Sequence, residues 1–322
     1  MQSTTFRPRT PDGWQLELTR FVDAKRRDPD RRPVLIIPGY GMNAYILSHH
    51  PSDVSIVGHL VAEGAEVWTA NLRGQGDSRR GSSAKSRYGF SELALIDLPC
   101  ALDEVLRLSD ATHVDLVGCS LGATIAYAYL AHNPYTHPLG TFVSMGGPLR
   151  WVRVHPLVRA VFSSPRLAGA LPISGTRAMA RAALPVAVRA PKLMSLYLNV
   201  DNIDLSDPAD LVRTVDDPTP HLNGQIARWV RDRDLVVDGV DITRAVNQVE
   251  AIPMLCVAAN RDGVVPLETA LSGLDHIGSR DTRALIAGDE RTWYAHADMF
   301  IARDARERVF EPLATWLASR AG

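Results

Sequence analysis

The sequence of 322 residues contains little cysteine and little lysine. Its three cysteines, Cys100, Cys119 and Cys256, are widely spaced and odd in number, which suits neither a metal cluster nor a disulfide framework. We therefore expect free thiols and a reducing compartment, the cytoplasm. Only three of the 35 basic residues are lysines. Because arginine is favoured over lysine throughout this chain, a group of arginines is weak evidence for a function.

The sequence also lacks an excess of either charge and lacks a long apolar run. The formal net charge is only -1, which gives no reason to expect a nucleic-acid partner. No stretch approaches the about 18 apolar residues of a membrane-spanning helix. The N-terminal segment is polar, carries Arg7 and Arg9, and is followed by no apolar run, so we expect no secretory signal.

Short apolar segments alternate with helical patterns along most of the chain. This alternation predicts an α/β fold with a mostly parallel sheet and helices on both faces. The predicted strands cover residues 15–21 (an edge strand), 33–37, 66–70, 113–118, 141–145, 253–259 and 282–287. The predicted helices cover residues 56–63, 91–108 (begun by Ser91 and kinked at Pro99), 121–132 and 304–318.

The alternation is lost between residues 149 and 249, where prolines recur and helical patches are irregular. We interpret this segment as a helical cap inserted into a core formed by residues 1–148 and 250–322. A chain of 322 residues is long enough for one substantial core with such an insertion.

The segment Gly118-Cys119-Ser120-Leu121-Gly122 matches the pattern G-x-S-x-G. An apolar strand precedes it and a predicted helix follows, which is the arrangement of a nucleophile elbow. Such a turn exposes the serine hydroxyl at the carboxyl edge of the sheet, beside a helix N-terminus that favours an anion. We therefore predict Ser120 as the nucleophile, and we expect Cys119 to pack beneath the turn.

A serine hydroxyl needs a base to take its proton, and the base needs an acid to orient it. His296 lies in the loop after the last predicted strand, and Asp262 lies in the loop directly after the strand that ends at residue 259. Their order after the serine is the order of nucleophile-elbow enzymes. We predict His296 as base and Asp262 as acid, with His276 as the alternative base and Asp289 and Asp298 as alternative acids.

With these motifs, the sequence resembles the α/β-hydrolase superfamily. The resemblance is carried by the segments PGYG, NLRGQGDS, GCSLG, RDGVVP and AHADMF, and it extends over nearly the whole chain outside the cap. The segments LVAEGAEVWTANLRGQGDS and PTPHLNGQIARWV are most similar to the branch of acid lipases and polyhydroxyalkanoate synthases or depolymerases. The synthases carry a cysteine nucleophile, whereas position 120 is serine, so polymer synthesis is not expected.

The resemblance implies an oxyanion hole made by the backbone N–H groups of Tyr40 and Leu121. Pro38 stands where many relatives carry histidine, which leaves a backbone donor at Tyr40 available. The resemblance also implies a structural role for the NLRGQGDS loop. This loop lacks the lysine of a phosphate-binding P-loop, and we predict no nucleotide, other cofactor or metal.

Residues 116–200 include no Asp or Glu, and the cap combines basic with apolar residues. Its basic residues in this stretch are Arg150, Arg153, Arg159, Arg166, Arg177, Arg181, Arg189 and Lys192. One interpretation is an apolar acyl pocket whose basic helices meet a lipid surface or an anionic substrate. The interpretation that we favour is an ordinary amphipathic lid with solvated arginines, which contacts no membrane.

The combined pattern predicts a serine hydrolase that cleaves a carboxylic ester of a small-molecule substrate, with a medium or long acyl chain, through an acyl-enzyme. An acyltransferase or thioesterase would use the same three residues and differ only in the acceptor or leaving group. A third hypothesis is a binding protein that has the fold without catalysis. The sequence makes no prediction of the oligomeric state.

Overall fold

The computed structural model describes residues 1–170 and 194–320. The predicted cap residues Leu171, Arg177, Met179, Arg181, Arg189 and Lys192 lie outside the described residues. Within the described part, an eight-stranded sheet has the order β1-β3-β5-β4-β7-β8-β11-β12. The strands β4, β5, β7, β8, β11 and β12 run parallel, and only β1 and β3 are antiparallel to their neighbours.

The strands of this sheet are short and, at its centre, wholly buried. They are β1 (Gln2–Phe6), β3 (Glu17–Val22), β4 (Val34–Ile37), β5 (Val67–Asn71), β7 (Val114–Cys119), β8 (Leu139–Met145), β11 (Met254–Ala259) and β12 (Thr282–Ala287). Short separate pairs are formed by β2 (Trp14–Gln15) with β6 (Arg79–Arg80), and by β9 (Val236–Val237) with β10 (Val240–Asp241). The predicted α/β fold class is therefore confirmed.

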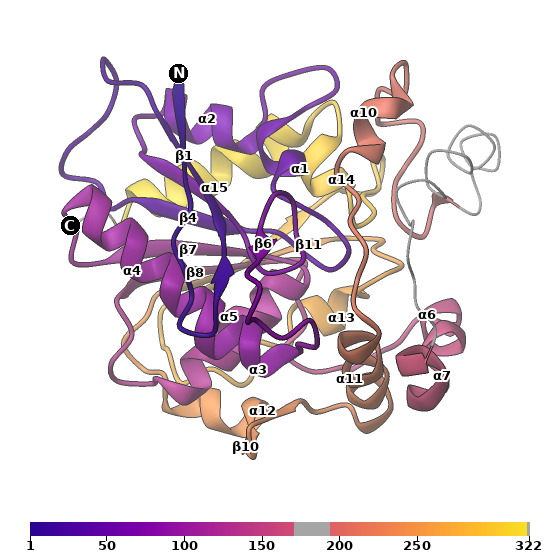
Figure 1. The fold of residues 1–322 in the computed structure, drawn as a ribbon. Coiled ribbons are helices and arrows are strands. Elements are labelled where there is room, and N and C mark those ends of the chain that lie inside the picture. The colour runs from indigo at the N-terminus through magenta and orange to yellow at the C-terminus, as the bar shows by residue number, and fades with distance from the viewer. Residues whose placement is uncertain (171–193, 321–322) are drawn as a thin grey trace.

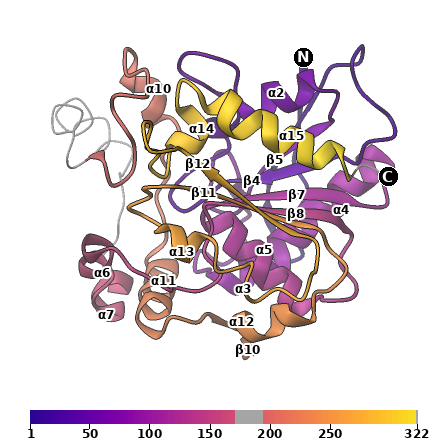
Figure 2. The ribbon, with the colours of Figure 1, turned by 180° about the vertical axis from the view of Figure 1, so that it is seen from behind.

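Helices cover both faces of the sheet (Figures 1 and 2). One face is covered by α3 (Phe90–Glu92), η1 (Leu93–Asp97), α4 (Leu98–Ser109), α5 (Leu121–His132), α12 (Ile242–Ala245) and η2 (Val246–Gln248). The other face is covered by α1 (Tyr45–Ser48), α2 (Ile56–Ala62), α14 (Asp298–Ile301), η3 (Arg306–Phe310) and α15 (Glu311–Ala318). In β4 the side chains alternate between the two cores, with Leu35 and Ile37 on the first face and Val34 and Ile36 on the second.

Two sequence predictions about element ends are wrong. The segment 15–21 is not an edge strand, because β1 pairs along the outside of β3. The sequence of β1, QSTTF, is polar and mostly exposed, so it lacks the apolar signal of a buried strand. Ser91 is not a helix N-cap either, because the cap is Gly89, whose N–H donates to the Glu92 carboxylate at 2.8 Å.

The expected break near Pro99 takes the form of a π-helical turn, η1, directly before α4. This turn carries Asp97 into the interior, where its carboxylate binds the buried Arg73 side chain at 2.6 Å. Arg73 also pairs with Asp12 at 2.6 Å and belongs to the NLRGQGDS loop. The loop is thereby fixed to η1 and to the turn that contains Asp12 by a buried charge that has two carboxylate partners.

Four helices of the predicted cap and one short helix lie near the carboxyl ends of the parallel strands (Figure 1). They are α6 (Pro156–Val161), α7 (Pro165–Ala170), α10 (Pro208–Val212), α11 (Pro220–Asp232) and, from the core, α13 (Leu267–Ala270). The division into core and cap at residues 149 and 249 stays a prediction. No helix among the described residues is long and apolar enough to cross a membrane.

Candidate active site

Ser120 lies between the end of β7 and the start of α5, at φ 52° and ψ −121°. A positive φ is unfavourable for a residue with a side chain and marks a strained turn. The Ser120 N–H donates to the carbonyl of Met145 at 2.8 Å, which fixes the turn to the end of the neighbouring strand β8. The structure therefore holds this serine in a sharp strand-to-helix turn.

The two glycines of the G-x-S-x-G segment stand where no side chain fits. A Cβ at Gly118 would lie 2.5 Å from the Cα of Ala123, and a Cβ at Gly122 would lie 2.6 Å from the carbonyl oxygen of Ile37. Both contacts are with backbone atoms, which cannot move aside cheaply. The close approach of α5 to the strands therefore requires glycine on both sides of Ser120.

Asp262 and His296 form a buried hydrogen-bonded pair. His296 Nδ1 lies 2.6 Å from Asp262 Oδ2, and the two residues are 3% and 6% exposed, respectively. The other carboxylate oxygen of Asp262 accepts the N–H groups of Val264 and Val265, each at 2.8 Å. These bonds orient the carboxylate, which in turn leaves Nε2 as the free nitrogen of the imidazole.

The loops that carry Asp262 and His296 are joined by their neighbours. Asn260 Oδ1 accepts the Tyr294 N–H at 2.8 Å, and the Arg261 N–H donates to the Tyr294 carbonyl at 3.0 Å. Because these bonds lie immediately beside the pair, they help to set the position of the carboxylate relative to the imidazole. Such contacts join residues more than 30 positions apart and leave no local pattern in the sequence.

Ser120 and His296 both lie beside the carboxyl end of β8. Met145 accepts the Ser120 N–H, and a Cβ at the next residue, Gly146, would lie 3.2 Å from His296 Cε1. Within the described chain, the Ser120 hydroxyl makes no hydrogen bond in this structure. Catalytic hydrogen bonds of this kind are often long without substrate, so the arrangement is compatible with proton transfer from Ser120 to His296.

The alternative acids have other partners. Asp289 accepts the N–H groups of Arg291 and Thr292 and forms an ion pair with Arg308 at 2.9 Å. Asp298 accepts the backbone N–H groups of Ala295 and Asn199. The alternative base, His276, has no hydrogen bond with Ser120 or with either of these acids among the described residues. Of the predicted acids and bases, the structure brings together Asp262 and His296.

The sequence indicated Asp298 only as an alternative acid and did not reveal its hydrogen-bond partners. Its carboxylate accepts the N–H of Ala295 at 2.7 Å and the N–H of Asn199 at 3.0 Å. The pKa of Asp298 is raised to about 7, chiefly by burial and in part by the nearby Asp262 carboxylate, against the hydrogen bonds from Ala295 and Asn199 that lower it. Asp298 therefore ties the His296 loop to a segment of the predicted cap.

The loop after β4 lies against Ser120. A Cβ at Gly39 would lie 2.8 Å from Ser120 Cβ, and the Gly39 carbonyl accepts a hydrogen bond from Gln75 Nε2 at 2.9 Å. In a trans peptide, the following N–H points opposite to this carbonyl, so Gln75 sets the direction of the Tyr40 N–H. Sequence reasoning assigned the NLRGQGDS loop a structural role and did not single out Gln75.

Leu121 is the first residue of α5, and its N–H is one of those that have no partner within the helix. The N–H groups of Tyr40 and Leu121 therefore come from the two backbone segments that flank Ser120. The Tyr40 hydroxyl donates to Asn223 Oδ1 on α11 at 2.6 Å, which joins this loop to the predicted cap.

A cavity of about 260 Å³ opens at Ser120. Apart from Ser120 and Tyr40, its walls are apolar, and they come from the core and from α6 and α11. The apolar lining includes Leu121, Trp151, Val158, Phe162, Ile226 and Trp229. Such a lining favours a hydrocarbon portion of a ligand over a charged one.

Cys119 is buried directly before Ser120, and burial raises the pKa of its thiol. The reactive thiolate is therefore disfavoured, which leaves packing as its role. Within the ranges 1–170 and 194–320, no group of three His, Cys, Asp or Glu side chains is arranged to hold a metal ion.

A sequence model of the family described as alpha/beta hydrolase fold matches residues 32–171. This segment runs from just before β4 through Ser120 into the predicted cap. The strands β11 and β12, which come later in the chain, complete the parallel part of the sheet. The chain has the α/β-hydrolase fold.

Curated relatives are similar to this chain over part of their length. "Probable lipase C14C8.15" of Schizosaccharomyces pombe is 30% identical over 135 residues, which are 38% of this chain and 29% of the relative. Human gastric triacylglycerol lipase is 29% identical over 136 residues, 39% of this chain and 34% of the lipase. The chain therefore spans about a third or less of the length of these relatives.

The fold is similar along the whole chain to that of solved α/β hydrolases. An esterase from Exiguobacterium antarcticum superposes with a TM-score of 0.64 at 17% identity and covers 98% of this chain and 100% of the esterase. At this identity the likeness concerns the fold. The fold alone therefore does not determine the activity, which depends on the residues of the site.

Proposed function

We propose that this α/β hydrolase is a carboxylic-ester hydrolase in which Ser120 attacks the ester carbonyl. The observation that carries the proposal is the strained turn at Ser120, which opens into an apolar cavity beside the buried Asp262–His296 pair. Activity on esters is also in keeping with the names of the relatives, two of which are lipases and one an esterase.

The mechanism follows from the orientation of each group. Asp262 holds the Nδ1–H of His296, so that Nε2 accepts the proton of Ser120 as its oxygen bonds to the carbonyl carbon. The N–H groups of Tyr40 and Leu121 stabilise the negative oxygen that develops. His296 then protonates the leaving alcohol, and water, activated by His296 in turn, releases the acid from Ser120.

The cavity supports a substrate with a medium or long acyl chain. Its volume is about 260 Å³ and its walls are almost wholly apolar. The removal of hydrocarbon from water into such a space stabilises the complex by about 0.8 kcal/mol per buried methylene group. The residues of the predicted cap, 149–249, supply part of these walls and are proposed to set the chain-length preference.

The proposal is tested by labelling with a fluorophosphonate probe, which reacts with activated serines. The wild-type protein should be labelled and should turn over some member of a chain-length series of p-nitrophenyl esters. Ser120→Ala should remain folded and lose both labelling and turnover. Ser91→Ala is a matched control, since Ser91 bonds to the exposed Asp238 and neither residue lines the apolar cavity, and it should keep both.

The outcome of this experiment also distinguishes the other hypotheses. Labelling at Ser120 without turnover of any ester would favour an acyltransferase or thioesterase, in which water is not the acceptor or the leaving group is a thiol. An absence of labelling in folded protein would contradict an activated serine and would favour a binding role.

A further inference from the structure

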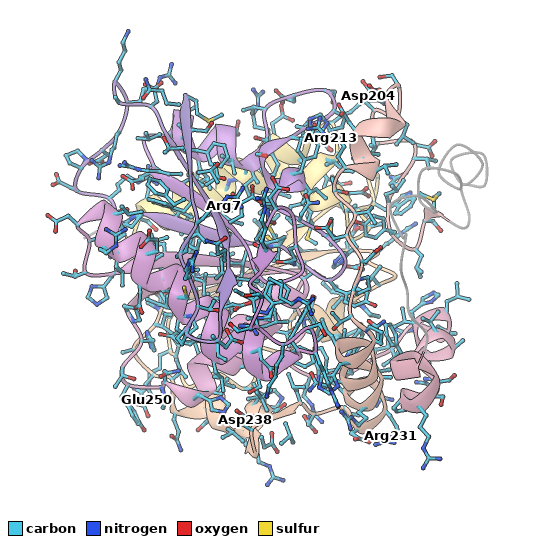
Figure 3. The ribbon with its side chains drawn as sticks, in the orientation of Figure 1. Arg7, Asp204, Arg213, Arg231, Asp238 and Glu250 are labelled. Atoms are coloured by element: carbon cyan, nitrogen blue, oxygen red, sulfur yellow. The ribbon has the colours of Figure 1, made fainter. Side chains whose placement is uncertain are left out.

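A second cavity lies on the other side of α11 from the apolar cavity. Its volume is about 670 Å³. Its walls carry the basic side chains of Arg87, Arg166, Arg228 and Arg231, together with His221, and include no Asp or Glu. Figure 3 labels Arg231 at the end of α11, on the side of the molecule where α7 lies. We call this cavity the basic cavity.

The basic cavity is assembled by the tertiary structure from separate segments. Arg87 comes from the loop before α3, Arg166 comes from α7, and the other basic residues come from α11. On α11 the lining residues are spaced by three or four, at positions 221, 224, 228 and 231, which is one face of the helix. The buried residues Ile226 and Trp229 lie on another face and line the apolar cavity.

Most of the positive charge in the basic cavity is uncompensated. Arg231 pairs with Asp232 at 2.6 Å. Arg87, Arg166 and Arg228 make no ion pair or hydrogen bond with any residue that the structure describes. The arginine bias of the chain explains that arginines are frequent, but it does not explain why three without partners converge on one concave surface.

The protonation of His221 responds to this local field. Its pKa is lowered, first by burial and then by the positive charges of Arg87 and Arg228. Glu92 acts in the opposite direction and does not reverse the effect. The surroundings of His221 are therefore net positive, as expected of a surface that attracts an anion.

We propose that the basic cavity binds a ligand that carries a phosphate group. Guanidinium groups bind phosphate through paired hydrogen bonds, and three converging arginines can surround such a group. The volume of about 670 Å³ lies within the range of small-molecule sites. This inference does not depend on ester hydrolysis, because it concerns a different surface of α11.

The test measures binding of inorganic pyrophosphate to the full chain by isothermal titration calorimetry at low ionic strength. The double variant Arg87→Gln, Arg228→Gln should weaken binding by about tenfold or more, since it removes charge-assisted hydrogen bonds. Arg283→Gln is the matched control, because Arg283 is an exposed arginine on β12, away from α11, and it should bind as the wild type does. Thermal unfolding of each variant establishes that it is folded.

A second arm distinguishes a phosphorylated small molecule from a lipid headgroup. Co-sedimentation is measured with phosphatidylcholine vesicles that contain phosphatidic acid and with vesicles of phosphatidylcholine alone. Binding in either arm that is lost in the double variant and kept in Arg283→Gln supports the proposal, and the arm that binds identifies the source of the phosphate. Binding in neither arm, or equal binding by the double variant, would overturn it.

Discussion

At the scale of single residues, the candidate site depends on side chains in which both terminal polar atoms make hydrogen bonds. Asp262 divides its two oxygens between the loop backbone and His296. Both terminal atoms of the Gln75 amide also make hydrogen bonds. Its Oε1 accepts the Leu72 N–H at 3.0 Å, and its Nε2 donates to the Gly39 carbonyl, beside Ser120. A side chain fixed at both ends holds the group that it contacts in one orientation.

This arrangement predicts that Gln75 is a positioning residue, which orients the Tyr40 N–H through the Gly39 carbonyl. In Gln75→Leu both hydrogen bonds are lost, and the peptide between Gly39 and Tyr40 can rotate. We expect kcat for ester hydrolysis to fall about tenfold, less than the about 100-fold or more that follows complete removal of an oxyanion donor. KM and thermal stability should change little, because Gln75 is partly exposed.

Steady-state kinetics with a p-nitrophenyl ester measure this effect. Gln75→Glu keeps an acceptor for Leu72 but places a carboxylate against the Gly39 carbonyl, so it should also lower kcat. Unchanged kcat in both variants would mean that the Tyr40 N–H does not need Gln75 for its orientation, or takes no part in the reaction.

At the scale of elements, buried charges join the sheet to its surroundings. Glu66, directly before β5, is 2% exposed. Its carboxylate binds Arg20 of β3 at 2.7 Å and Arg27 at 2.9 Å, and it accepts hydrogen bonds from Trp68 and from Ser109 at the end of α4. This one side chain therefore connects two strands, a helix and a loop.

The charge state of Glu66 predicts a pH-dependent stability. Burial raises its pKa, but hydrogen bonds from Arg20, Ser109 and Trp68 lower it more, so that the pKa lies below the ordinary 4.5. The stabilisation is therefore fully present above the unfolded-state value and is lost as pH falls through the lower folded-state pKa. We expect Glu66→Gln to reduce the free energy of unfolding by about 2 kcal/mol at neutral pH.

Urea denaturation at neutral pH and at about pH 3 measures this difference. The difference in the free energy of unfolding between the wild type and Glu66→Gln should be smaller at the lower pH. Glu63→Gln is the control, because Glu63 is exposed and close in sequence, and it should have little effect at either pH. A difference that stays constant with pH would show that packing rather than charge makes Glu66 important.

At the scale of the whole molecule, the parallel strands bring the site together at one edge of the sheet. The loops after β4, β7, β8, β11 and β12 all emerge at the carboxyl ends of neighbouring strands. The helices α6 and α11 of the predicted cap then close the apolar cavity over Ser120. In the proposed function, the core positions the chemistry, while the predicted cap shapes the space for the substrate.

This division predicts that a change in the cap alters substrate choice without loss of chemistry. Val158 lies on α6 and lines the apolar cavity. Val158→Trp should fill part of this space and lower kcat/KM for long-chain p-nitrophenyl esters by about tenfold or more. The acetate ester should be hydrolysed about as fast as by the wild type, because its acyl group needs little of the cavity.

Val236→Trp is the matched control, since Val236 is an exposed valine on β9 and does not line this cavity. It should leave the whole chain-length series unchanged. If Val158→Trp lowered turnover of all chain lengths equally, the cavity would not be the acyl site.

The chain order and the local patterns were enough to predict the fold class and to select Ser120, Asp262 and His296. Buried parallel strands are continuous apolar runs, a turn at a serine between strand and helix has a short signature, and both loop residues follow recognisable strands. β1 was missed for the opposite reason, because a polar strand at the edge of a sheet has no such signature.

Only the tertiary structure decided which side chains meet. The bond from Gln75 to Gly39 spans 36 positions, and the pairing of Asp262 with His296 spans 34. The apolar cavity and the basic cavity likewise combine segments that are far apart in the chain. Local sequence determines which conformation a segment prefers, whereas contacts, burial and the direction of a peptide N–H depend on how segments pack, and packing is a property of the whole fold.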